Sequence, residues 1–139
     1  MVSIKRILIP TDGSDCAKKA AEYALEIAEK LGTAVQCLFV FDYNSLTSLK
    51  FPDTEEYIRE TCDKMVNEIV EMGKKHNVEV GPVTGTGDPA NYIISISGDY
   101  DLIVMGTVGR TRLAHALMGS VAEKTVRLAK CPVLVVKDE

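Results

Sequence analysis

Short apolar segments alternate with segments of helical periodicity along this chain of 139 residues. Continuous apolar runs of this length are typical of strands buried on both faces of a sheet. The repeated strand–helix order predicts right-handed crossovers and a parallel β-sheet covered by helices on both faces, in one α/β domain spanning residues 1–139. The third strand is the least hydrophobic, so we expect it near an edge of the sheet. The expected strands are residues 4–9, 35–41, 78–84, 100–105 and 132–136.

Capping residues indicate where the expected helices begin and end. Ser14 or Asp15 is the candidate N-cap of the first helix, and Gly32 suits the left-handed residue that ends it. The second helix is expected to end near Gly73, and the last one covers residues 121–129.

One glycine-rich segment imitates a dinucleotide-binding turn. Residues 85–90 fit the pattern G-x-G-x-x-A, but they follow the third strand, whereas the fingerprint belongs after the first. Asp88 as N-cap and Pro89 at the first helical position explain this segment without NAD, and they predict a short helix over residues 89–97.

The charge of the chain argues against a nucleic-acid partner. The formal net charge is −4, whereas a nucleic-acid binder carries a basic stripe. The charge is uneven, because residues 106–137 carry six basic side chains and one acidic side chain. A small anionic ligand and a solvated basic face on the last helix both account for that asymmetry.

The cysteines and the apolar runs predict a soluble, cytoplasmic protein. Four cysteines stand far apart, without a C-x-x-C pair, as expected of reduced thiols. The apolar run near the amino terminus is too short for a signal peptide, and no run reaches the ~18 to 20 residues of a membrane span. We therefore expect no membrane partner.

The most specific motif consists of three glycines and a serine. Gly106 and Gly109 are separated by two residues, and Gly119 and Ser120 follow after nine more. The motif lies between an apolar run and a helical pattern, at the strand edge where open α/β sheets place ligands. Glycine lets the backbone approach a phosphate without a Cβ, and the first amides of the next helix point at the same place. Positive charge is available from Arg110, Arg112 and His115.

Ser120 has a second interpretation. With Glu123 it matches the capping box S-x-x-E, in which the serine hydroxyl accepts from a first-turn amide. If Ser120 caps the helix in this way, the amides of residues 119–121, more than the hydroxyl, are expected to hold the phosphate.

With these residues the chain resembles the universal stress protein family. The signature Gly-x2-Gly-x9-Gly-Ser matches in full, and residues 7–14, 101–106, 119–124 and 131–136 are also similar to the family. The resemblance implies a Rossmann-like, adenine-nucleotide α-hydrolase-like fold with a five-stranded parallel sheet in the order 3-2-1-4-5. For members that keep the signature, it also implies ATP binding.

The resemblance further implies roles for single residues. Asp12 would hold the ribose or a metal, although an Asx turn in Thr-Asp-Gly also accounts for this residue. Val40 would offer its backbone to adenine, and a Mg²⁺ or Mn²⁺ ion would be held mostly by phosphate and water. The other implied nucleotide contacts are Pro10, Thr11, Met105, Gly106, Gly109, Arg110, Gly119, Ser120 and Val121.

The resemblance also implies a homodimer that forms through the last strand. An unprotected apolar edge strand invites pairing with another chain. Proline lacks an N–H and is therefore confined to a strand start or an edge, which fits the first of these residues. The implied interface residues are Pro132, Val133, Leu134, Val135 and Val136.

No catalytic residues are predicted. No Ser/His/Asp set, carboxylate pair or nucleophile elbow stands out, and no candidate base lies beside the glycine motif. We expect an ATP-binding stress-response or signalling regulator whose nucleotide alters conformation or partner binding. The alternatives are a slow Mg²⁺-dependent ATPase and a nucleotide-independent dimeric scaffold.

Overall fold

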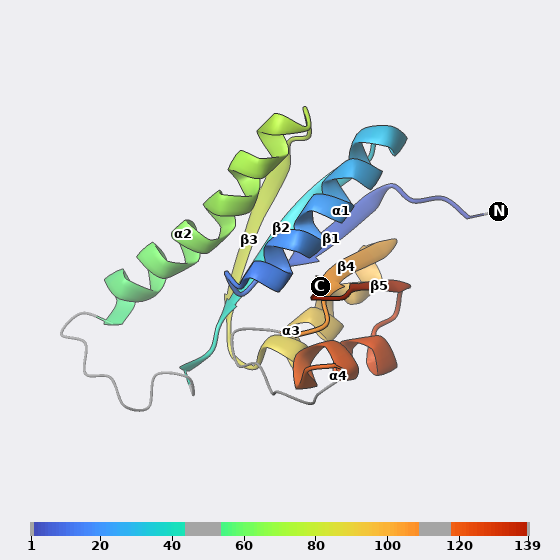
Figure 1. The fold of residues 1–139 in the computed structure, drawn as a ribbon. Helices are drawn as coiled ribbons and strands as arrows, with labels where there is room; N and C mark the ends of the chain where they lie inside the picture. The colour runs from blue at the N-terminus through green and yellow to red at the C-terminus, as the bar shows by residue number, and fades with distance from the viewer. Residues whose placement is uncertain (1, 44–53, 109–117, 139) are drawn as a thin grey trace.

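The computed structural model describes residues 2–43, 54–108 and 118–138. Strands and helices alternate through these residues (Figure 1). The strands are β1 (Arg6–Pro10), β2 (Ala34–Phe41), β3 (Val80–Thr86), β4 (Leu102–Gly106) and β5 (Val133–Val136). The helices are α1 (Asp15–Leu31), α2 (Thr54–Lys75), α3 (Pro89–Ile96) and α4 (Ser120–Leu128), and a 3-10 turn, Ser97–Asp99, precedes β4.

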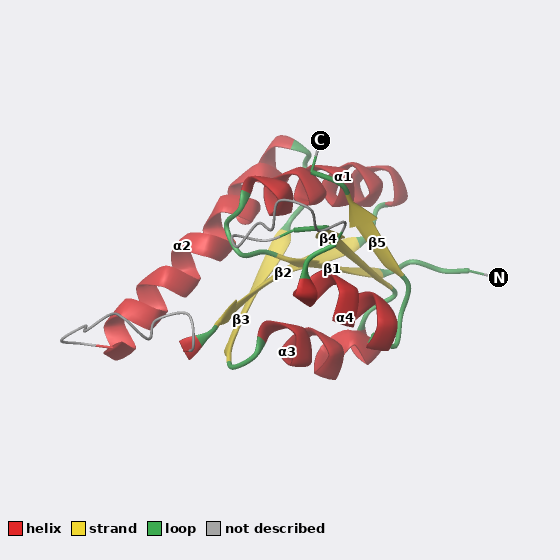
Figure 2. Cartoon of the chain, turned by 60° about the horizontal axis from the view of Figure 1, so that its bottom comes forward, coloured by secondary structure: helices red, strands yellow, loops and turns green. Residues whose placement is uncertain are grey.

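The strands form a parallel sheet in the order β3-β2-β1-β4-β5, which confirms the expected fold class and the edge position of β3. Helices α1 and α2 cover one face and α3 and α4 the other (Figure 2). Alternate residues of a strand point to opposite faces. Ile7 and Ile9 of β1 accordingly pack in the core beneath α1 and α2, whereas Leu8 packs in the core on the side of α3 and α4. All three side chains are fully buried.

Local capping fixes the starts of two helices as predicted. The Ser14 hydroxyl accepts from the Ala17 amide at 3.1 Å, and α1 ends at Gly32, whose φ is +65°. Asp88 accepts from the Asn91 amide at 2.9 Å, and α3 begins at a proline.

Helix α2 ends at Lys75, two residues beyond Gly73, near which its end was expected. A Cβ on Gly73 would lie 2.6 Å from the carbonyl oxygen of Val78 and 2.6 Å from a methyl group of Val80. Glycine therefore allows the end of α2 to approach the start of β3 and does not act as a cap. The chain turns instead at Asn77, with a φ of +56°, and β3 begins two residues later than expected.

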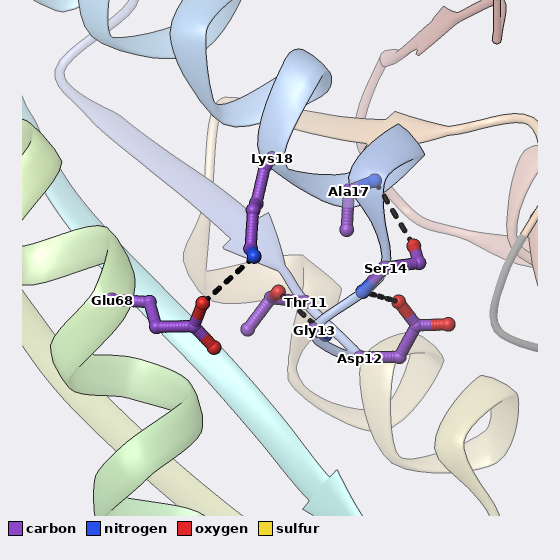
Figure 3. Close-up of polar contacts among 7 residues, drawn as sticks. All are labelled: Thr11, Asp12, Gly13, Ser14, Ala17, Lys18 and Glu68. Atoms are coloured by element: carbon purple, nitrogen blue, oxygen red, sulfur yellow. Dashed lines mark hydrogen bonds and ion pairs between the residues drawn. The ribbon is translucent and has the colours of Figure 1, made fainter.

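Two sets of contacts between charged or titratable side chains connect α1 with α2 and with the residue just after it. Lys18 of α1 and Glu68 of α2 form an ion pair at 2.9 Å, which raises the pKa of Lys18 (Figure 3). His76, which follows the end of α2, contacts two carboxylates of α1, Glu22 at 2.9 Å and Glu29 at 3.2 Å. Hydrogen bonds to Glu22 and then to Glu29 raise the pKa of His76.

Among the described residues, no helix combines the length and the apolarity needed to cross a lipid bilayer.

Replacing His76 by glutamine should lower the free energy of unfolding more at acidic than at alkaline pH. Because the pKa is raised in the folded protein, the stabilisation is complete below the ordinary histidine value of about 6.5 and is lost as the pH rises through the raised value. Urea denaturation of both proteins at about pH 5.5 and about pH 9 measures the difference. A difference that is the same at both pH values would contradict the role of His76. In a background with Glu22→Gln and Glu29→Gln, the effect should become nearly independent of pH.

Candidate functional site

A cavity of about 560 Å³ opens at the carboxyl end of the sheet, beyond the ends of β1, β2 and β4. The chain leaves β1 toward α1 on one face and leaves β4 toward α4 on the other (Figure 2). Open α/β sheets bind ligands where the connections after two neighbouring strands go to opposite faces of the sheet. The volume lies within the usual range for small-molecule sites, about 300–1,000 Å³.

The cavity brings together residues that lie far apart in the chain. Gly109 and Arg110, like Arg112 and His115, lie outside the described residues. The predicted site residues that line the cavity are Pro10, Thr11, Asp12, Val40, Met105, Gly106, Gly119, Ser120 and Val121.

The turn after β1 is held by its own side chains (Figure 3). The Asp12 carboxylate accepts from the Ser14 amide at 2.9 Å, and the Thr11 hydroxyl accepts from the Gly13 amide at 3.1 Å. Gly13 adopts a φ of +81°, a conformation that favours glycine. The Asx turn considered for Asp12 is therefore present, and it fixes this residue in the wall of the cavity.

The end of β2 offers backbone groups to the cavity. β1 stops opposite Leu38, whose carbonyl accepts from the Thr11 amide at 2.9 Å, while β2 continues to Phe41. The Phe41 carbonyl accepts from the Gly87 amide on the β3 side, at 3.0 Å. Because successive residues of a strand direct their backbone groups to opposite sides, Val40 presents its N–H and C=O toward the side where β1 has ended.

The capping box considered as a second interpretation of Ser120 and Glu123 is not formed. Gly119 is the N-cap of α4, and Ser120 is already the first helical residue, one position too late to cap. Glu123 instead contacts Arg127 of the same helix at 3.6 Å. Since glycine has no side chain, the first amides of α4 receive no acceptor from their cap residue.

The amino end of α4 faces the cavity. Gly119, Ser120, Val121 and Ala122 all line it. The first amides of a helix have no partner within the helix and carry the positive end of its dipole. This end of the cavity is therefore suited to an anion.

Gly106 has a different role from the one expected. A Cβ on this residue would lie 2.6 Å from the Cys16 sulfur and 3.1 Å from the Cys16 carbonyl carbon and oxygen. Glycine is needed here so that the start of α1 can pack against the end of β4. The expectation that its missing Cβ makes room for a phosphate is not supported, because protein atoms occupy that space.

In the described part of the cavity, the groups that attract an anion belong to the backbone and not to charged side chains. Asp12 and Asp42 are the charged side chains among its described lining residues, and both are acidic. The described residues also contain no group of three or more His, Cys, Asp or Glu side chains arranged to hold a metal ion. An anion in the described part would thus depend on the amides of α4 and on any cation that it brings.

The sequence patterns missed several lining residues. Tyr57 and Thr61, one turn apart on α2, line the cavity, and the Tyr57 ring packs edge-on against Phe41 with centroids 6.1 Å apart. Nothing local marked these residues, because α2 approaches from another layer of the fold. The other lining residues that were missed are Ala17, Leu38, Phe39, Phe41, Asp42, Pro89, Ile93, Thr107, Val108 and Ala122.

Comparison with known proteins identifies the family. The model of the universal stress protein family matches residues 3–137. Universal stress protein MJ0531 of Methanocaldococcus jannaschii is 37% identical, over 96% of this chain and 82% of its own length. The solved structure of MJ0577 from the same organism superposes with a TM-score of 0.84 at 29% identity, covering 99% of each chain. A universal stress protein solved in complex with cAMP has the same fold, with a TM-score of 0.73 at 23% identity over 96% of this chain and 97% of its own. The chain belongs to the universal stress protein family.

Proposed function

We propose that this protein binds ATP in the cavity at the carboxyl end of the sheet and acts as a stress-response or signalling regulator. Nucleotide occupancy would alter its conformation or its binding to a partner. The uncapped amino end of α4 in the cavity wall is the observation that carries this proposal.

The start of α4 suits the phosphates. In α1 and α3 the side chains of Ser14 and Asp88 accept from first-turn amides, whereas Gly119 leaves those of α4 to an external acceptor. An oxygen-rich anion satisfies such amides and also interacts favourably with the helix dipole. The amides of Ser120 and Val121 would bind the phosphates beside Gly119, whose own amide, also expected to do so, already donates to the Thr107 carbonyl. A phosphate-binding role is also proposed for Gly109 and Arg110.

The opposite wall suits adenosine. The Val40 N–H can donate to N1 of adenine, and its C=O can accept from the exocyclic amino group. Pro10, Thr11 and Met105 lie beside this position among the lining residues, and Asp12 can accept from the ribose hydroxyls. A relative with the same fold has been solved in complex with cAMP, which is also an adenine nucleotide. The proposal that this chain binds ATP is based on the residues of its own cavity.

A divalent cation fits the same proposal. Carboxylate and phosphate oxygens are the ligands that Mg²⁺ and Mn²⁺ accept, and Asp12 is the candidate protein ligand. When bound, the cation would neutralise phosphate charge near Asp12 and Asp42.

We also propose that the protein acts in the cytoplasm. The cysteines are free thiols, and burial raises the pKa of Cys37 to about 12. Unpaired thiols suit a reducing compartment.

ATP should bind more tightly than GTP, by about tenfold or more. Guanine carries an oxygen where adenine carries an amino group, so it presents the wrong partners to the Val40 backbone. Isothermal titration with each nucleotide in the presence of Mg²⁺ measures the difference. Equal affinities would contradict the adenine assignment. Phosphate release in the same sample, followed over hours, would support the slow ATPase instead of a regulator that keeps its nucleotide intact.

Replacing Ser120 by proline should weaken ATP binding while preserving α4. Proline is favoured at the first helical position, and Gly119 before it already has the extended backbone, φ −72° and ψ 165°, that a residue before proline prefers. The change removes one amide donor to a charged group, a loss of about 1.5–3 kcal/mol.

Ser120→Ala is the matched control, because it removes the hydroxyl and keeps the amide. We expect its affinity for ATP to stay much closer to that of the unmodified protein, as measured by titration, with circular dichroism to verify folding. Similar weakening in both variants would assign the contact to the hydroxyl and contradict the amide site.

We further propose that the protein forms a homodimer through β5. This strand is an edge of the sheet, and edge strands with exposed apolar side chains pair readily with another chain. Leu134 of β5 is 37% exposed, and Val126 and Leu128 of the neighbouring helix α4 are also exposed.

Leu134→Lys should shift the protein from dimer to monomer in sedimentation at micromolar concentration. A charge on an edge strand opposes strand pairing. Leu31→Lys is the control, since Leu31 is a similarly exposed leucine at the end of α1. A dimer that persists in Leu134→Lys, or dissociates equally in Leu31→Lys, would exclude β5 as the interface.

A further inference from the structure

Thr107 connects the cavity with the end of β5 through its backbone. Its amide donates to the carbonyl of Val136, the last residue of β5, at 3.0 Å. Its carbonyl accepts from the amide of Gly119, the N-cap of α4, at 2.5 Å. Thr107 itself is buried and lines the cavity. One residue thus lies between the anion-binding end of the cavity and an edge strand.

Cys16 of α1 also contacts the carbonyl of Val136. Its thiol donates to the Val136 carbonyl at 3.6 Å and lies 3.9 Å from the Thr107 hydroxyl. Cys16 is in the first turn of α1, next to Ala17, which lines the cavity. The contact is possible because Gly106 has no Cβ. The carbonyl of Val136 is therefore held by one donor from the first turn of α1 and one from the residue that follows β4.

We propose that Thr107, together with Cys16, is a positioning residue that couples nucleotide occupancy to the carboxyl end of β5. This inference rests on the proposed nucleotide site. A phosphate bound at the start of α4 restrains Gly119, which in turn restrains the Thr107 carbonyl. The amide of the same residue then holds Val136 in place.

The coupling has a consequence at the edge of the sheet. A nucleotide that stabilises the end of β5 also stabilises the strand at which we propose that a second copy pairs. Coupling between two binding sites is reciprocal, so pairing along β5 raises the affinity for nucleotide by the same factor.

Hydrogen–deuterium exchange, read by mass spectrometry with and without ATP and Mg²⁺, tests this coupling. Exchange should slow in the segments that line the cavity and, by about fivefold or more, in the peptide that contains β5. β3 is the internal control, because it is the opposite edge strand and none of its residues, all of them described, lines the cavity.

The possible outcomes separate the coupling from the nucleotide site itself. Slower exchange around the cavity but not in β5 would overturn the coupling and leave ATP binding intact. Equal slowing in β3 and β5 would indicate general stabilisation and would also overturn it. If ATP slows exchange nowhere, the proposed nucleotide site fails.

Variants of Cys16 test the second donor. Cys16→Ala should reduce the protection that ATP adds to β5 by about twofold or more, whereas Cys16→Ser keeps a donor and should retain it. Cys62→Ala is the matched control, because Cys62 is a buried thiol of α2 in the core. Undiminished protection in Cys16→Ala, or an equal loss in Cys62→Ala, would overturn the role of Cys16. If Cys16→Ala does not fold, Cys16→Ser and the unmodified protein still test the coupling.

Discussion

The hydrogen bond from the Thr11 amide to the Leu38 carbonyl is the last one that joins the β1 segment to β2, and the cavity begins where it ends. Beyond it the chain turns through Asp12 and Gly13 into α1, while β2 continues to Phe41 with a neighbour only on the β3 side. A β1 two residues longer would pair with Val40 and fill the space. The site thus depends on a difference in length between two adjacent strands.

The parts of the fold that sequence patterns predicted correctly depend on residues close together in the chain. Ser14, Gly32 and Asp88 cap helices through contacts within three or four residues, and the apolar runs identify the strands to within about two residues. Gly73 indicated the end of α2 to within two residues, but its close packing against Val78 and Val80 could not be predicted, because the turn at Asn77 brings those residues back. A glycine needed for close packing and a glycine that ends a helix look alike in sequence.

The difference between contacts near in the chain and contacts made by packing also decides which site residues could be predicted. Residues at strand ends could be predicted, since parallel strands bring their carboxyl ends to one edge. Tyr57 and Thr61 could not, because their place in the cavity depends on how α2 packs against β2 and β3. The Ser120 capping box failed for another reason: the pattern S-x-x-E does not specify whether the serine precedes the first helical residue or is that residue.

The two described glycines of the signature, Gly106 and Gly119, are therefore needed for different physical reasons. Gly106 is required by the packing of Cys16 against β4, and Gly119 leaves the first amides of α4 without a side-chain acceptor. The first allows α1 to pack close to the end of β4, and the second makes the start of α4 receptive to an anion. Thr107 lies between them in the chain and contacts both Gly119 and Val136. A motif first interpreted as a phosphate-binding loop is, in its described part, a packed junction of two helix starts and an edge strand. Such a junction is the arrangement required by the proposed coupling between a bound ligand and β5.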